Sequence, residues 1–121
     1  MINLIGKAGR SLVSILLDIE HLLRQTHAYD HANHSEVIVG LLDSDPEAAV
    51  RELTSNLFWG GSGSFSDLFL CSGNGDISDD FNRDNKLLAG LLLELLHALK
   101  AKGHNHPNFA FVEKSLANRS K

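Results

Sequence analysis

Near the middle of the chain the sequence reads Leu57-Phe58-Trp59-Gly60-Gly61-Ser62-Gly63-Ser64-Phe65-Ser66-Asp67-Leu68-Phe69-Leu70. This glycine-rich segment holds the only tryptophan of the chain, three of its six phenylalanines and three glycines. Large apolar side chains that alternate with glycine are typical of a backbone that turns sharply while its flanks stay buried. We therefore expect the segment to be the turn about which an α-helical domain folds.

Apolar residues recur three and four positions apart on both sides of this segment, a spacing that predicts amphipathic helices. The predicted fold class is all-α: a compact bundle of four main helices, with the glycine-rich turn and a short helical turn over 65–70 between the third and the fourth. Residues 1–121 form a single domain whose tail frays from about residue 118. The expected main helices cover residues 9–27, 31–42, 46–59 and 79–102, and one or two further turns from residue 109 dock on them.

Local signals predict where two of these helices begin. Asp45 precedes Pro46 at the start of the third helix, where an aspartate can cap free N–H groups and proline suits the first helical position. Asp30 is the candidate N-cap of the second helix, because it lies in a polar turn at residues 29–33. We therefore expect backbone N–H groups of the following turns to donate to both aspartates.

Two further signals concern the end of the third helix and the turn that follows it. Gly60 and Gly61 stop the helix, and one of them takes the left-handed conformation that a side chain disfavours. Ser64 and Asp67 are spaced as in a capping box, in which each side chain bonds the backbone of the other end of the turn. Asp67 is therefore expected to be a helix cap, with a site residue beside the glycines as the alternative.

Composition limits the classes of function. The single cysteine, Cys71, excludes an internal disulfide and favours a reducing cytoplasm as the location. No apolar run reaches the roughly eighteen residues that cross a bilayer, so no membrane partner is expected. The formal net charge of −4 and the scattered basic residues argue against nucleic acid and favour a basic protein partner. We expect no cofactor.

Histidines give the metal hypothesis. His27, His31 and His34 would share one face of a single helix, and imidazole nitrogens are ligands that zinc accepts. The turn predicted at residues 29–30 breaks that geometry, so the alternative is a set of solvated polar residues near helix ends. Cys71 offers a nucleophile to a catalytic protein, whereas a buried inert thiol is the commoner state of a single cysteine.

The run Phe58–Leu68 resembles a motif found in a family of small uncharacterised bacterial proteins, a domain of unknown function. Members of that family are similar in having a helix that ends in Phe-Gly-Gly-Met-Gly-Ser-Phe/Leu-Asn-Asp-Leu, then a loop and a long amphipathic helix. This chain departs from the motif by inserting Trp59, by Ser62 where methionine is usual and by Ser66 where asparagine is usual. The resemblance covers residues 45–99 and implies no established activity.

Our leading hypothesis is a non-enzymatic protein-binding module, of the kind that immunity proteins represent when they neutralise bacterial toxins. Large aromatic side chains at a turn make good interface anchors. The partner-binding candidates are therefore Trp59, Phe65 and Phe69, together with Asp67, and core packing is the alternative for each of the three rings. The alternatives are a histidine-rich metal-binding or catalytic protein that uses the region of the glycine-rich turn, and a homo-oligomeric structural protein.

Overall fold

The computed structural model describes residues 10–61, 63–70 and 79–121. Within these ranges the chain forms helices and no strand, which confirms the all-α fold class. None of the described helices is both long enough and apolar enough to cross a bilayer. In chain order the elements are α1 (Leu12–Gln25), α2 (Tyr29–Ser44), α3 (Pro46–Leu53), α4 (Asn56–Trp59), the 3-10 helix η3 (Phe65–Asp67), α5 (Asp79–Ala101) and α6 (Phe109–Arg119).

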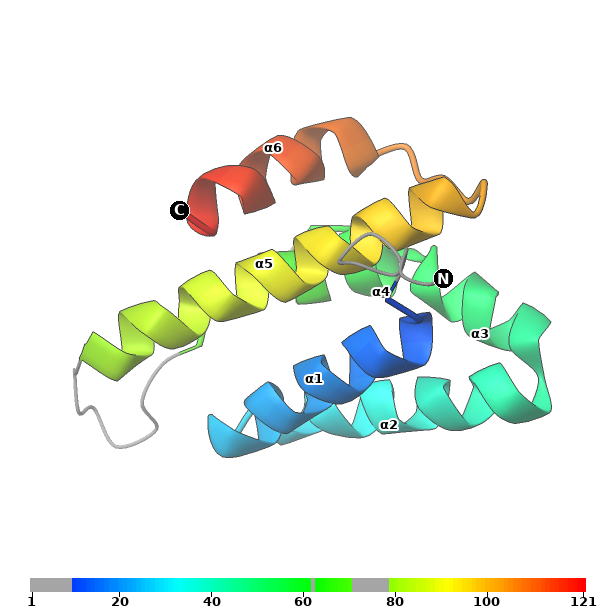
Figure 1. Cartoon of the computed structure of the whole chain (residues 1–121), viewed down its shortest axis with the longest axis horizontal. Helices are drawn as coiled ribbons and strands as arrows, with labels where there is room; N and C mark the ends of the chain where they lie inside the picture. Colours follow the sequence, from blue (N-terminus) through cyan, green and yellow to red (C-terminus); the bar gives the residue numbers. More distant parts are fainter. Residues whose placement is uncertain (1–9, 62, 71–78) are drawn as a thin grey trace.

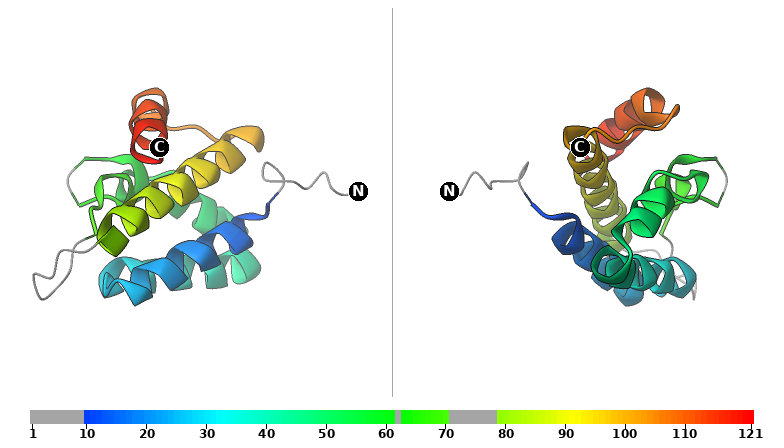
Figure 2. Two further views of the ribbon diagram at one scale, coloured as in Figure 1. Left: turned by 60° about the vertical axis from the view of Figure 1, so that its left-hand side comes forward. Right: turned by 90° about the vertical axis from the view of Figure 1, so that its right-hand side faces the viewer.

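The long helix α5 lies at the centre of the arrangement. The helix α1 packs against one side of α5 and also against α2, whereas α6 packs against the other side of α5 (Figure 1). The short elements α4 and η3, which belong to the glycine-rich segment, contact each other and lie beside α5 (Figure 2). The leucine-rich face of α5 therefore forms the middle of the core, and its fully buried leucines are Leu88, Leu92, Leu95, Leu96 and Leu99.

The third predicted helix is divided in two, so the expectation of one continuous helix over residues 46–59 is wrong. The Thr54 hydroxyl donates to Val50 O at 2.8 Å, and the Ser55 hydroxyl donates to Glu52 O at 2.6 Å. Such side-chain bonds compete with the helical ladder. Ser55 then starts α4, because its hydroxyl oxygen also accepts from Leu57 N at 3.2 Å.

One predicted N-cap is confirmed and the other is wrong. Asp45 Oδ1 accepts from Ala48 N at 3.3 Å, and Pro46 takes the first position of α3. Asp30 does not cap α2, because the helix starts earlier and Ala28 occupies the capping position without a side-chain bond. Asp30 lies instead in the first turn, where its charge faces the positive end of the helix dipole.

The left-handed glycine of the segment is Gly63, with φ of 87°, and not Gly60 or Gly61 as predicted. Gly60 ends α4 in an extended conformation, with φ of −77°. It must be glycine for another reason: a Cβ there would lie 2.6 Å from the carbonyl oxygen of Asn56. The sequence therefore predicted the helix stop correctly and placed the left-handed residue too early.

The predicted capping box is also wrong. Ser64 precedes η3 but makes no capping bond with its side chain. Its hydroxyl instead donates to Gly60 O at 3.1 Å and lies 3.1 Å from the Ser66 hydroxyl. The serine therefore closes the loop onto the end of α4, and Asp67 is left exposed.

The C-terminal part forms a longer helix than the sequence predicted. In place of one or two turns, α6 is an 11-residue helix that ends at Arg119, and fraying of the tail from about residue 118 stays a prediction. Phe109, Val112 and Leu116 are buried on its inner face. The outer face of the same helix forms one wall of the site described next.

Candidate functional site

The inner side of the glycine-rich segment is made of buried aromatic rings. Phe58 and Phe65 stack with centroids 4.0 Å apart, and Trp59 meets Phe109 of α6 edge to face at 5.4 Å. The indole N–H of Trp59 donates to Leu53 O at 2.6 Å. Trp59 and Phe65 have no exposed surface, so for these two partner-binding candidates the structure shows the alternative, core packing.

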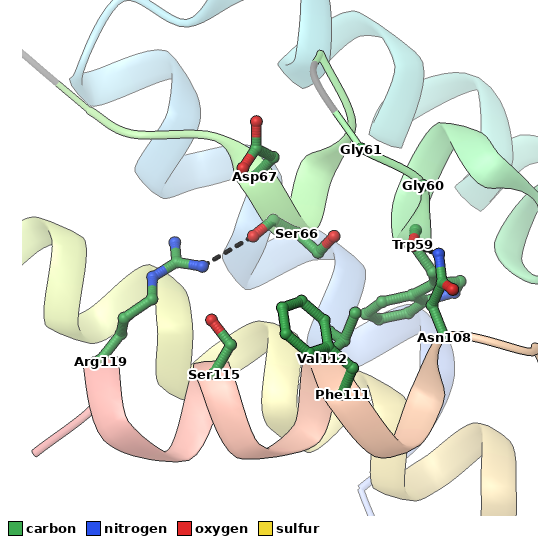
Figure 3. Close-up of a pocket in the computed structure, with 10 residues that line it drawn as sticks. All are labelled: Trp59, Gly60, Gly61, Ser66, Asp67, Asn108, Phe111, Val112, Ser115 and Arg119. Atoms are coloured by element: carbon green, nitrogen blue, oxygen red, sulfur yellow. Dashed lines mark hydrogen bonds between the residues drawn. The ribbon is translucent and has the colours of Figure 1, made fainter.

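The outer side of the segment is held to α6 by polar side chains at the two ends of that helix. Asn108 Nδ2 donates to Trp59 O at 2.8 Å. Three turns later, Arg119 donates to Ser66 O at 2.7 Å (Figure 3) and also to Leu68 O at 3.3 Å. These bonds satisfy backbone carbonyls that a turn leaves without partners, and they fix the spacing between the segment and the helix.

His106 positions the first of these contacts. Its ring is 8% exposed, its Nδ1 accepts from Asn108 N at 3.0 Å, and its Nε2 lies 2.8 Å from Asn56 Oδ1. Because a backbone N–H can only donate, the ring hydrogen belongs on Nε2 and points to Asn56. The imidazole therefore links α4 to the start of α6 and holds Asn108 over Trp59.

Between these two anchors the segment and α6 enclose an open cavity of about 270 Å³, which we call the α6 cleft. Phe111 stands from α6 into this space, and its side chain is 76% exposed (Figure 3). Ser115 and Arg119 follow it along the same wall. The lining residues are Trp59, Gly60, Gly61, Ser66, Asp67, Asn108, Phe111, Val112, Ser115 and Arg119.

A second cavity of about 270 Å³ lies on the other side of Arg119 and shares that residue. Its other lining residues are Phe69, Asn82, Asn85 and Lys86. Asn85 fixes this wall, because its amide oxygen accepts from Leu70 N at 2.8 Å and its amide nitrogen donates to Leu70 O at 2.9 Å. We call this the α5 cleft. An exposed phenylalanine thus lines each cavity, and one arginine lines both.

Two groups of charged side chains that tie helices together lie away from the two clefts. Bonds to Glu94 first, and then to Asp18, raise the pKa of Arg10 above its ordinary value. The Arg10–Glu94 pair, with two contacts of 2.8 Å, ties the start of α1 to α5. These groups are neutralised within the protein, so they stabilise helix contacts and leave little charge for a ligand.

A similar tie joins α5 to α6. His97 Nε2 lies 2.7 Å from Glu113 Oε2, and Lys100 Nζ lies 3.3 Å from Glu113 Oε1. The bond from His97, followed by that from Lys100, lowers the pKa of the Glu113 carboxyl below its ordinary value. The exposed pair supports the docking of α6 on the side opposite the α6 cleft.

The three histidines proposed for metal binding each make a different contact. His27 lies two residues after the end of α1 with φ of 66°, and its ring lies tilted against that of Tyr29. His31 Nε2 donates to Gly63 O at 3.2 Å, whereas His34 is 3.6 Å from a carboxylate oxygen of Glu52. Among the residues described by the structure, no group of three histidine, cysteine or acidic side chains is placed to hold a metal ion. Cys71 lies outside the described residues.

The sequence-based site and the observed site overlap in part. Asp67 and Phe69 are exposed, at the α6 and α5 clefts respectively, and their role in partner binding stays a prediction. Arg119 and Phe111 were missed. A signal for Phe111 existed, because the apolar positions 109, 112 and 116 of α6 follow helical spacing and residue 111 falls outside that stripe.

The fold and site together define an all-helical protein with a partly polar, partly aromatic cleft beside a glycine-rich turn. No protein-family model matches the chain, and comparisons with curated proteins and with solved structures return no match. The resemblance to a bacterial domain of unknown function therefore stays a prediction that rests on the motif at Phe58–Leu68.

Proposed function

We propose that this protein is a non-enzymatic binding module whose α6 cleft contacts another protein. The observation that carries the proposal is Phe111, whose ring is 76% exposed at the cleft, while Trp59, Phe58 and Phe65 behind it are fully buried. A large aromatic side chain beside a concave surface is the kind of residue that anchors protein interfaces. Phe69, which is 63% exposed, offers a second ring at the neighbouring α5 cleft.

The way in which the cleft walls are held supports this proposal. Asn108 and Arg119 bond the backbone of the glycine-rich segment from either end of α6, and His106 fixes Asn108 in turn. A wall that is ordered before the partner arrives loses less conformational entropy on binding. The polar contacts therefore favour a preformed docking surface over one that assembles with its partner.

The net charge of this protein predicts the sign of the charge on its partner. The chain has a formal net charge of −4, so a partner with a basic surface is attracted and association weakens as salt rises. A small acidic protein that occupies a basic one is the arrangement used by immunity proteins against toxic enzymes. We propose the immunity role on this ground, with cytoplasmic location as part of the same hypothesis.

The test is a capture experiment with matched variants. The tagged wild-type protein, Phe111→Ser and Val37→Ser are incubated with a lysate of the source organism. Val37 is an exposed apolar residue of α2, 59% exposed and outside both clefts. We expect wild type and Val37→Ser to retain the same protein, and Phe111→Ser to lose it by about 30-fold in affinity, the size of a hot-spot residue. Equal retention by both variants would contradict the proposal.

Two further observations separate the finer hypotheses. An immunity role predicts a neighbouring gene for a large secreted protein with a toxic C-terminal domain. Cells that express this toxic domain should grow again when they also express the present protein. A homo-oligomeric structural protein, the alternative reading, would instead retain only its own chain in the capture experiment. Light scattering at micromolar concentration then measures the mass of one chain for a binding module and a multiple of it for the alternative.

A further inference from the structure

Arg119 differs from two other arginines that tie parts of the protein together. Arg10 and Arg24 each donate to two carboxylates. Arg119 is partly buried, yet within the described part of the chain it bonds two neutral oxygens, the carbonyls of Ser66 and Leu68. Its positive charge therefore has no carboxylate counterpart among the described residues.

The guanidinium keeps unused binding capacity where a ligand can reach it. The group has five N–H donors, and the bonds to Ser66 and Leu68 use two of them. The side chain lines both the α6 cleft and the α5 cleft. Asp67 is the single carboxylate in the described lining of these cavities. Figure 3 places it on the far side of the Ser66 backbone from α6, and no ion pair joins it to Arg119.

We infer that Arg119 receives a glutamate or aspartate side chain of the partner protein, while Phe111 packs against the neighbouring apolar part of the same segment. The inference rests on the proposed function and names the chemistry of its anchor. A planar guanidinium matches a carboxylate with two parallel hydrogen bonds. Ser115, one turn before Arg119 on the same wall, adds a hydroxyl that can donate to the bound carboxylate.

Local charge agrees with this assignment, although the whole chain is acidic. The described lining of the two clefts carries Arg119 and Lys86 as cations and Asp67 as the anion. A carboxylate is therefore attracted at this point of an otherwise acidic protein. The net charge attracts a basic partner from a distance, and one acidic residue on that partner then fixes the register of docking.

Blocked tripeptides provide the probe. Acetyl-Ala-Glu-Ala-amide, its glutamine analogue and its lysine analogue are titrated into the full-length 15N-labelled protein. We expect saturable millimolar binding of the glutamate peptide, with shifts at the Gly60 and Gly61 amides and at Arg119 Nε–H. The neutral glutamine peptide should bind about fivefold or more weakly, because it lacks the charge-assisted pair, and the lysine peptide should not saturate.

Variants test which residue carries the selectivity. Arg119→Gln should abolish the preference for glutamate over glutamine, and Arg119→Lys should restore only part of it, because an ammonium lacks the fork. Lys114→Gln is the matched control, an exposed lysine of α6 outside both clefts, and should leave the preference unchanged. Because Arg119 also holds the segment, Phe111→Ala gives an independent variant at an exposed position, expected to weaken both peptides by about threefold or more without altering their ratio.

Three results would overturn the inference: equal affinity for the glutamate and glutamine peptides, an absence of saturation by the glutamate peptide at tens of millimolar, or free acetate binding as tightly as the peptide. The last result would show a general anion site without a docking segment. If capture of a partner still depends on Phe111 while the glutamate preference is absent, the proposed function stands and the acidic anchor is wrong. If capture is independent of Phe111 while Arg119 prefers glutamate, the proposed function fails and the carboxylate site remains.

Discussion

On its inner side the glycine-rich segment meets the bundle through aromatic rings, whereas on its outer side it meets α6 through hydrogen bonds to backbone carbonyls. Phe58, Trp59 and Phe65 fill the inner side with no exposed surface. Asn108 and Arg119 hold the outer side from points three turns apart. The difference shows why the cleft forms: rings close-pack, but two polar contacts at the ends of a helix leave the space between them open.

The largest expected effect comes from emptying the inner side. Trp59→Ala should lower the free energy of unfolding by about 3–5 kcal/mol, because it removes a fully buried ring and leaves a cavity. Urea denaturation followed by circular dichroism measures the loss. Phe111→Ala is the matched control on the outer side and should change stability by less than about 0.5 kcal/mol. If both variants lose a similar amount of unfolding free energy, the inner and outer sides of the segment do not differ as described.

The next effect concerns the tight end of α4. Gly60→Ala should cost about 1–3 kcal/mol, because the new Cβ would lie 2.6 Å from the backbone oxygen of Asn56 and the chain must shift. Gly61→Ala meets no atom within 4 Å and should be neutral or stabilising by up to about 1 kcal/mol. Thermal unfolding of the two variants measures the difference. If Gly60→Ala is as stable as wild type, the close approach of residue 60 to the Asn56 backbone does not require glycine.

Removing a hydrogen bond between α6 and the outer side of the segment should lower the free energy of unfolding by less. Asn108→Ala removes the bond to Trp59 O and should lower stability by about 0.5–1.5 kcal/mol. Hydrogen exchange should show the gain in opening at the N-terminal end of α6 and in the segment, with the inner core unchanged. Asn118→Ala, an exposed asparagine near the other end of the same helix, serves as control. If both asparagines behave alike, the bond to Trp59 O does not position the wall.

The smallest effect is a pH dependence of α6 docking. Because the folded state lowers the pKa of Glu113, the pair with His97 and Lys100 stabilises the protein above the ordinary carboxyl pKa. That contribution is lost as the pH falls below the ordinary value and through the lowered one. In Glu113→Gln, the free energy of unfolding should therefore fall less steeply with decreasing pH across this acid range. It should match that of the wild type at pH values where the Glu113 carboxyl is protonated in both the folded and the unfolded state. The free energy of unfolding is measured by chemical denaturation at several pH values. If its dependence on pH is the same in Glu113→Gln and wild type, the contacts of Glu113 with His97 and Lys100 do not stabilise the docking of α6.

Helix positions were predictable because apolar spacing and caps are local signals. The leucine repeat of α5 and the Asp45 cap of α3 follow directly from residues that are neighbours along the chain. The break at Thr54 and Ser55 was missed, since hydroxyl-to-backbone bonds compete with the helix only in a particular geometry. The sequence left open whether Trp59 is exposed or packed in the core, because its burial depends on a contact with Phe109, which is distant in sequence.

The site was harder to predict than the fold for the same reason. Arg119 reaches Ser66 across 53 residues of chain, and Asn108 reaches Trp59 across 49. No spacing rule joins such positions. The sequence indicated the importance of the glycine-rich segment, but the opposite wall of the cleft comes from a helix for which only one or two turns were expected.

The most direct test of the α6 cleft as a protein-binding site is photo-crosslinking from Phe111 in cells of the source organism. The residue is replaced with benzoylphenylalanine, which keeps an aromatic ring at the same exposed position, and Val37 is replaced in the same way as a control on α2. We expect one covalent adduct from position 111 that is absent from position 37. No adduct from position 111, or the same adducts from both positions, would contradict the account.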